Sequence, residues 1–583
     1  MRCILIGVLG VAACALRIAG AFLPPSSVAA RKTTTYLAST TTAESLSGTA
    51  APDKASQSYN SVVVGGGPAG LLSAIALARK YPDRKIAVFD RLPAPPSPTD
   101  VAVWNQTDRF YLIGLGHRGQ KALGRFDVWD DVEAVCSPVF GRKDWAPGAS
   151  VDEGVERLAT DKPTTTQVLP RDKLVGVLYK HIMENFPDQV ELNYGYEADI
   201  FDFGDSSEQS VKLGVSKCVV ADGSEMTPEP EAECEVDNYR VVNTDFLIGA
   251  DGAARGLANE MESKDAERLA AINPAQRLFA KKTQFKVKRF VDDNQRVYKS
   301  IPVKVPSNWR FDLNYSARSR GNRMAFELLP ADDQGTYCGI LLIKPDDELA
   351  APNSDPAKLR KFFADEFPQF SSLIDDNTLS LAAEKSSSNL PGFRYAGPRI
   401  HQGDRTVLLG DAIHTVKPYY GLGANTALED VSELCDCLDS AADLKSAVEM
   451  FSEKRAVEAN ALVTISRNMD RPGKLGLAAF LVPLILDGIF YRLAPRLFAP
   501  GMFSLFQKDG VTFKWMQRRK RIDRAVQLTI IGSTFYGMFQ GFKASVSLVA
   551  RRLGMDGRVV GAVTIAASVL LRSVKNSLKP KEA

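Results

Sequence analysis

Residues 61–78 read SVVVGGGPAGLLSAIALA. An apolar, β-branched run is followed at once by glycines and then by helix-forming residues, which predicts a strand, a tight turn and a helix. Gly65, Gly67 and Gly70 have the spacing GxGxxG. In such a turn the first glycine permits the bend, the second lets the backbone approach a pyrophosphate, and the third lets the helix pack on the strand. The first N–H groups of the helix are favourable donors for the phosphate.

A second apolar strand follows this helix. Residues 85–89 read KIAVF and lead into Asp90, at the spacing after Gly70 that is typical of a dinucleotide-binding acid. A carboxylate at this position accepts hydrogen bonds from ribose hydroxyls. Strand, glycines, helix, strand and acid in register predict a dinucleotide-binding α/β domain, and this motif alone is compatible with both FAD and NAD.

Two later predicted strands end in turns that carry an aspartate. They read FLIGADG at residues 246–252 and TVLLGDAIH at residues 406–414. PYYGLGAN follows at 418–425, and a helix is predicted from 426 to 438. Asp411 can hold a ribityl or ribose hydroxyl, while the glycines and the helix start present N–H groups to an electron-rich ring edge. Each segment alone would be an ordinary strand and turn.

In this order, the segments resemble those of the FAD-dependent aromatic hydroxylases, the flavoprotein monooxygenases with the para-hydroxybenzoate hydroxylase fold. The resemblance implies an α/β fold: a Rossmann-type FAD-binding domain, an interleaved substrate-binding β-sheet domain and a C-terminal helical region. Within this family, three stretches are similar to kynurenine 3-monooxygenases: FYLIGLGHRGQKAL at 110–123, VLPRDKL at 168–174 and PYYGLGANTALED at 418–430.

The resemblance implies roles for single residues. Arg142 matches an arginine that pairs with the substrate carboxylate, and a guanidinium fork suits that group. A loop arginine is also commonly a solvated ion-pair partner. Asn425 matches an asparagine beside the substrate and the flavin, and it could equally cap its helix. Pro418 would shape the pocket at the flavin, and His414 is placed beside the flavin by the motif or is structural.

The implied sites fall into two sets. The catalytic set is Arg142, Pro418 and Asn425. The cofactor-binding set is Gly65, Gly67, Gly70, Asp90, Arg118, Arg171, Asp251, Gly252, Gly410, Asp411, Gly421, Gly423, Ala424 and Asn425. The histidines and cysteines show no metal-binding spacing, so no metal site is predicted.

Three positions depart from the kynurenine 3-monooxygenase pattern. The family's substrate-binding tyrosine falls near Glu156, where the sequence has no tyrosine. Leu422 stands in place of a glutamine, and residues 251–255 (DGAAR) lack the usual serine and Val-Arg pair. These departures leave the substrate open, whereas the flavin motifs are intact.

The implied chemistry is that of the cofactors. No second GxGxxG follows a strand, which fits transient binding of NADPH (or NADH). The resemblance implies that the nucleotide reduces FAD, that O2 adds at flavin C4a as a hydroperoxide, and that one oxygen atom passes to an aromatic substrate. The favoured reaction is kynurenine 3-hydroxylation. The alternatives are hydroxylation or epoxidation of a lipophilic plastid substrate (a quinone precursor or a carotenoid) and a non-catalytic FAD-binding regulatory protein.

The length of 583 residues, 45% of them hydrophobic and 24% charged, predicts several globular domains. A discontinuous FAD-binding domain is expected from residues 60–135, 166–265 and 385–460. The substrate-binding domain is expected from 136–165 and 266–384, and a C-terminal helical region from 461–583.

The N-terminus has the composition of targeting segments. A short basic start, an apolar stretch and small residues predict a signal peptide over residues 1–21. Residues 22–55 begin with a phenylalanine and continue rich in Ser, Thr and Ala, as in a transit peptide. This order resembles the bipartite presequences of algae with secondary plastids, so a plastid location is predicted, with plain secretion as the alternative. The cysteines suggest no disulfide framework.

The charge is uneven along the chain. Residues 500–583 carry 15 basic and 4 acidic side chains, while the body of the chain is acidic. This excludes a nucleic-acid binder and fits a tail that meets anionic lipid, or else a solvated basic helix face. Residues 525–542 carry no charge and follow the basic run at 518–521. A helix lying on a membrane is favoured there over a span or a packed helix, with peripheral contact through 518–571. The shorter run 475–486 predicts a buried helix.

Overall fold

The computed structural model describes residues 56–559, apart from 107–110, 160–163, 205–208, 220–232, 254–255, 274–275, 278–282, 555 and 557. The described residues fall in one compact unit that begins at Lys54. The predicted signal peptide and transit-like segment lie outside the described residues.

The strand, turn and helix predicted from residues 61–78 are present. Strand β1 (Gln57–Val64) leads through the glycine turn into α2 (Pro68–Lys80). β1 lies between β2 (Ile86–Asp90) and β11 (Glu233–Gly249) and pairs with both in parallel. The carboxyl ends of three parallel strands therefore meet at the glycine turn, which is where open α/β sheets bind ligands.

The sheet built on β1 has eight strands. Its order is β19-β20-β11-β1-β2-β8, and β10 pairs antiparallel with β11 and with β9. The β2–β8 and β11–β20 pairs are also parallel. The bounds are β8 (Val190–Tyr194), β9 (Tyr196–Asp202), β10 (Val211–Val219), β19 (His401–Gln402) and β20 (Thr406–Leu408).

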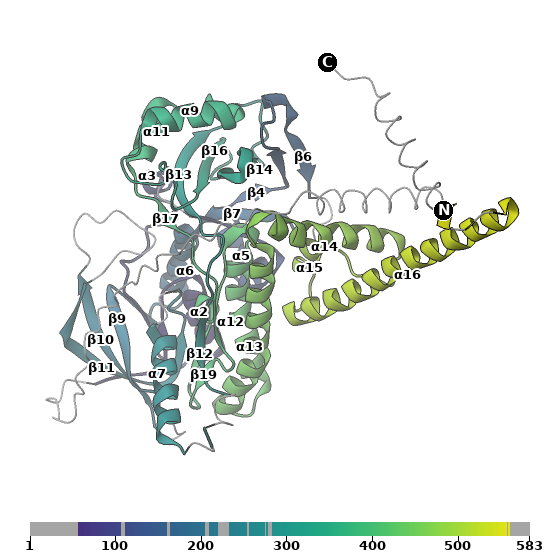
Figure 1. Cartoon of the computed structure of the whole chain (residues 1–583). Helices are drawn as coiled ribbons and strands as arrows, with labels where there is room; N and C mark the ends of the chain where they lie inside the picture. The colour runs from purple at the N-terminus through teal and green to yellow at the C-terminus, as the bar shows by residue number, and fades with distance from the viewer. Residues whose placement is uncertain are drawn as a thin grey trace. The chain divides into compact units, whose positions relative to one another are not determined.

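Helices pack around this sheet and build the larger core. Helix α12 (Leu422–Ser440) packs on α2, on α4 and on α13 (Leu444–Met469), and α2 packs on α6. Figure 1 shows α12 and α13 running side by side, in green. The other helices of this part are α3 (Val101–Trp104), α4 (His117–Arg125), α5 (Trp129–Glu133), α6 (Arg171–Asn185) and α7 (Gly256–Ala271).

A second sheet has seven strands in the order β17-β13-β16-β15-β14-β5-β6. It joins β5 and β6, from the first segment predicted for the substrate domain, to β13–β16 from the second. One face of the sheet builds a separate core under α9, α10 and α11. The bounds are β5 (Gly141–Trp145), β6 (Val155–Leu158), β13 (Val297–Lys304), β14 (Leu313–Arg318), β15 (Met324–Pro330), β16 (Thr336–Ile343), β17 (Ser388–Asn389), α9 (Pro356–Glu366), α10 (Pro368–Ser371) and α11 (Asp376–Glu384).

Two three-stranded sheets complete the fold, and with them the predicted α/β class is confirmed. Their orders are β3-β7-β4 and β12-β18-β21. Cys218 on β10 is disulfide-bonded, which the cysteine spacing did not predict. The bounds are β3 (Leu112–Leu115), β4 (Ser137–Val139), β7 (Thr166–Pro170), β12 (Lys286–Arg289), β18 (Arg394–Gly397) and β21 (His414–Thr415).

The C-terminal region is helical, as predicted, but one helix is more exposed than expected. Helix α14 (Gly473–Leu493) contains the run 475–486, which was predicted to be buried. That prediction is wrong: Leu475 is 88% exposed, and only Gly476, Leu486 and Asp487 of α14 are buried. The reason is that α14 packs only lightly against its neighbours α13 and α16. By length and composition α14 could cross a membrane.

Helix α15 (Met502–Phe506) leads to α16 (Phe513–Leu553), which contains the uncharged run 525–542. Within that run only Gln527 is buried. The run is therefore not packed into a core formed by the described residues. In the basic run at 518–521, Lys520 is buried in ion pairs with Asp487 and Asp523. Nearly all of the further apolar segment 559–571 lies outside the described residues.

Candidate flavin and substrate site

One cavity of about 3240 Å³ is lined by both large sheets. It is larger than the roughly 300–1,000 Å³ of a typical small-molecule pocket, so it has room for a dinucleotide and a second ligand. All predicted site residues line it except Gly70 and Gly410. Those two glycines act in packing behind the cavity wall.

The glycine turn forms a cradle that larger residues would fill. A Cβ on Gly65, whose φ is +107°, would lie 2.2 Å from the carbonyl oxygen of Ala250. A Cβ on Gly70 would lie 1.8 Å from the carbonyl oxygen of Gly65. At Gly67 only the Arg171 guanidinium comes near, at 3.4 Å. The turn therefore places open backbone and a cation together, which fits the pyrophosphate of FAD.

Asp90 closes the ribose side of this cradle. Its two carboxylate oxygens accept from the backbone N–H groups of Gly66 at 2.6 Å and Leu92 at 2.8 Å. A carboxylate oxygen can accept more than one hydrogen bond, so the group, which lines the cavity, can also receive a ribose hydroxyl. Asp251 and Asp411 line the cavity at the ends of two further strands.

Asn425 ties the walls of the site together. Its Oδ1 accepts from the N–H groups of Gly116 at 2.8 Å and Gly119 at 3.2 Å, and its Nδ2 donates to the carbonyls of Gly114 and Gly421. It does not cap its helix, because Gly421, at a φ of +61°, precedes α12 without a side-chain cap. These four bonds give Asn425 a positioning role between β3, α4 and the start of α12.

His414 belongs to a buried network behind the cavity, so the structural reading of this residue holds. Its Nε2 lies 2.9 Å from Oδ2 of Asp430, and both side chains are fully buried. Arg455 bonds to Asp430 and to Glu429. Burial opposes the charge of Asp430, but Arg455 and His414 outweigh it and hold the pKa of Asp430 below its usual value. Sequence patterns did not predict the partners of Arg455, because Glu429 and Asp430 lie on another helix.

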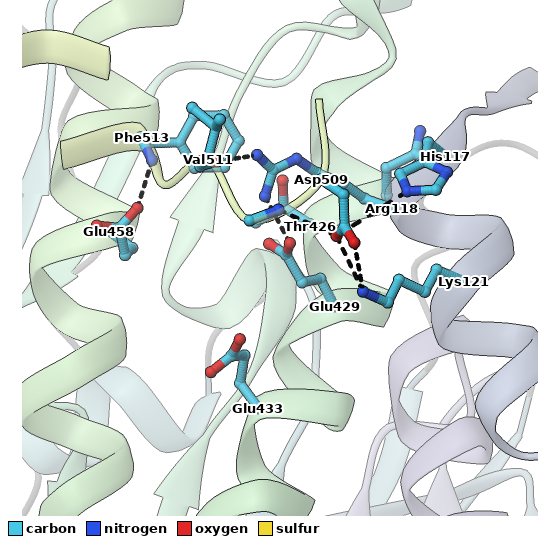
Figure 2. Close-up of polar contacts among 12 residues, drawn as sticks. His117, Arg118, Lys121, Thr426, Glu429, Glu433, Glu458, Asp509, Val511 and Phe513 are labelled. Atoms are coloured by element: carbon cyan, nitrogen blue, oxygen red, sulfur yellow. Dashed lines mark hydrogen bonds and ion pairs between the residues drawn. The ribbon is translucent and has the colours of Figure 1, made fainter. Parts of the chain in front are cut away.

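Arg118 connects α4 to α12 and to the C-terminal region (Figure 2). Its guanidinium pairs with Glu429, donates to the carbonyls of Phe506 and Val511, and lies 4.8 Å from the ring centre of Phe513. Figure 2 also shows Lys121 with Asp509, and Glu458 receiving the Phe513 N–H. Arg118, which was predicted to bind the cofactor, lines the cavity and also donates to protein groups that hold α15 beside it.

Arg142 lines the cavity from β5, and acidic side chains already balance its charge. Its Nε donates to Asp144 at 2.6 Å, and its Nη2 lies 3.6 Å from Glu327. Arg157 also pairs with Asp144, and Ser316 donates to Glu327. Burial raises the pKa of Glu327, and Arg142 opposes that rise.

Glu156, at the position where the family has its tyrosine, pairs with Arg310 at 2.9 Å and does not line the cavity. Aromatic residues that the sequence did not single out border the cavity instead. The ring centres of Tyr420 and Phe503 lie 5.5 Å apart, and those of Phe503 and Phe480 lie 6.3 Å apart. They connect the turn at 418–421 to helix α14.

Comparison with known proteins identifies the family. The family described as "FAD binding domain" matches residues 216–465. The kynurenine 3-monooxygenase of Salinispora tropica is 27% identical over 472 residues, covering 80% of this chain and 92% of that protein. The chain is an FAD-dependent monooxygenase, similar to these proteins along most of its length. FAD is therefore the cofactor of this monooxygenase, and the glycine cradle is where it fits.

A fungal relative and a solved structure agree with this assignment. The kynurenine 3-monooxygenase of Yarrowia lipolytica is 23% identical over 485 residues, covering 82% of the monooxygenase described here and 95% of its own length. The crystal structure of a mutant of 2-methyl-3-hydroxypyridine-5-carboxylic acid oxygenase has a TM-score of 0.50 at 15% identity and covers 73% of this chain and 96% of its own. That likeness shows the fold alone.

Proposed function

We propose that this monooxygenase hydroxylates the aromatic ring of L-kynurenine, with NADPH (or NADH) as electron donor. The observation that carries the proposal is the likeness to kynurenine 3-monooxygenases along 92% of the Salinispora tropica protein. When bound, the flavin supplies the activation of O2, and the chain's own residues bind, orient and exclude water.

We assign the chain's residues distinct tasks. The Gly65–Gly67 turn and the start of α2 would hold the pyrophosphate of FAD, and Asp90 would accept from its ribose. The turn at Pro418–Tyr420 borders the ring end of the cavity. Burial raises the pKa of Tyr420 to about 12, so its hydroxyl stays protonated and can donate to a ligand. The aromatic side chains around it exclude water from the reacting groups.

The test uses purified, FAD-loaded protein that starts at residue 56. NADPH and NADH oxidation is followed with and without L-kynurenine, and the product is identified by mass. We expect oxidation to accelerate with L-kynurenine and 3-hydroxykynurenine to accumulate. Bound FAD with neither acceleration nor hydroxylated product would contradict the substrate.

A lipophilic plastid substrate, such as a quinone precursor or a carotenoid, is a second candidate. It is favoured by helix α14, which lines the cavity with Leu477 and Phe480 and carries exposed apolar side chains. An apolar ligand held in a membrane could reach the cavity along this helix. To test this candidate, the enzyme is incubated with a plastid lipid extract, NADPH and ¹⁸O2. We expect ¹⁸O in a lipid-soluble product, and its absence would contradict this substrate class.

We also propose that the chain is sent to a plastid and touches a membrane there through residues 518–571. A plastid location is supported by the order of the N-terminal segments: a basic start, an apolar stretch, small residues and a Ser/Thr-rich segment. The exposed apolar run of α16 supports the contact. Residues 1–55 fused to a fluorescent protein should reach the plastid of an alga with secondary plastids, and fluorescence in the medium would instead indicate secretion.

A further inference from the structure

The cavity face of the seven-stranded sheet carries two arginines in different surroundings. Arg142 on β5 stands opposite Asn314 on β14, and Arg318 ends β14 on the same face, because residues alternate between the two faces of a strand. Both arginines line the cavity. The other face of this sheet forms a closed apolar core.

A substrate carboxylate at Arg142 would meet two acidic groups. Asp144 accepts from its Nε at 2.6 Å, and Glu327 lies 3.6 Å from its Nη2. An incoming anion would be repelled by these carboxylates, or it would have to draw Arg142 away and leave Glu327 without its cation. The site around Arg142 is therefore already balanced in charge.

No acidic side chain of the described residues lies within ion-pair distance of Arg318, although its charge still acts on Glu327 from farther away. Among the residues that the structure describes, no side chain or carbonyl forms an ion pair or a hydrogen bond with it. Its neighbours across the sheet on the cavity face are Ala325, then Leu342, then Tyr298. All three line the cavity. The small Ala325 leaves room beside the guanidinium, and the other two offer a flat apolar surface to an aromatic ring.

Arg318 is also close enough to the turn at Pro418–Tyr420 for its charge to act on Tyr420. The same charge acts on Glu327 and on Arg296. Arg296 is engaged by the carbonyls of Asn322 and Arg323. Arg318 is thus a cation at the end of β14, near the turn at Pro418–Tyr420, and within the described part of the chain it has no hydrogen-bond or ion-pair partner.

We propose that Arg318 binds the carboxylate of the aromatic substrate, and that Arg142 is a structural ion-pair partner. The proposal rests on the proposed hydroxylation of an aromatic compound that carries a carboxylate. The proposal fixes the orientation of the bound substrate. Its carboxylate would lie at Arg318, and its ring would lie over Leu342 and Tyr298 toward the turn at Pro418–Tyr420.

The test is ligand binding, measured by the change in flavin absorbance of the FAD-loaded protein and by calorimetry. The probes are L-kynurenine and anthranilate, each paired with an analogue that lacks the carboxylate: kynurenamine and aniline. The variants are Arg318→Gln, Arg318→Lys and the matched control Arg142→Gln. Hydrogen bonds to charged groups are worth about 1.5–3 kcal/mol, so Arg318→Gln should weaken binding of the acids about 10- to 100-fold and that of the analogues less than about twofold. Arg318→Lys should restore part of the loss, and Arg142→Gln should lower the melting temperature without separating acids from analogues.

The outcomes separate this proposal from the proposed function. A carboxylate-dependent loss in Arg142→Gln but not in Arg318→Gln overturns the assignment, and so does wild-type protein that binds acids no better than their analogues. If anthranilate binding depends on Arg318 while L-kynurenine does not bind, the anchor is supported and the proposed substrate fails.

Discussion

At the scale of single residues, Asn425 joins three elements through four hydrogen bonds. Asn425→Ala removes all four and leaves buried backbone groups unpaired, at about 1–3 kcal/mol for each unsatisfied group. We expect a clear loss of thermal stability and weaker FAD retention, measured by melting temperature and by flavin content after gel filtration. Unchanged flavin content would contradict the positioning role.

Gly70 limits the distance between α2 and the turn. A methyl group there would lie 1.8 Å from the carbonyl oxygen of Gly65, so Gly70→Ala must push the helix from the strand. Overpacking of this kind costs about 1–3 kcal/mol, and we expect loss of FAD binding in an equilibrium dialysis measurement. Gly124→Ala is the matched control, because its Cβ meets nothing closer than 3.8 Å. Equal FAD affinity in the two variants would count against the cradle.

His401 should make stability depend on pH. Burial lowers its pKa below the ordinary 6.5, although a bond to the Gly403 carbonyl opposes the change. The unfolded chain then takes up a proton at higher pH than the folded one. The contribution is therefore present above about pH 6.5 and is lost as the pH falls through the folded pKa. Melting temperatures between pH 7.5 and 5.5 should fall less steeply for His401→Gln than for the wild type, and parallel curves would contradict this.

At the scale of elements, sequence patterns predicted the features that depend on residues close together in the chain. The glycine turn and Asp90 lie within one β-α-β unit, so their arrangement follows from spacing. An ion pair was one of the two roles expected for Arg142, but its partner Glu327 could not be predicted, because the two residues meet only through the pairing of β5, β14 and β15. The exposure of α14 depends in the same way on which helices pack against it.

The apolar face of α14 leads to a prediction about membranes. Leu475, Leu481 and Ile485 are all exposed, so replacing them together with Asn should leave the fold intact. We expect the wild type to sediment with phosphatidylglycerol vesicles and the triple variant to sediment several-fold less, because apolar burial and anionic attraction both contribute. Val291→Asn, at an exposed apolar residue elsewhere, is the control. Equal sedimentation of the triple variant and the control would exclude α14 from the contact.

At the scale of the whole molecule, the two large sheets supply different halves of one cavity. The eight-stranded sheet provides the glycine cradle and the strand-end aspartates, and the seven-stranded sheet provides the arginines and the apolar floor. The C-terminal helices reach the same cavity through Phe480, Phe503 and Gln507. All three parts of the fold therefore contribute residues to one cavity.

The most direct measurement of monooxygenase activity is isotope transfer. FAD-loaded protein is given NADPH, L-kynurenine and ¹⁸O2, and the product is analysed by mass. We predict stimulated NADPH oxidation and a hydroxylated product that carries one ¹⁸O atom. Oxygen derived from water, or NADPH oxidation that yields only peroxide with every aromatic and lipid substrate offered, would contradict the account.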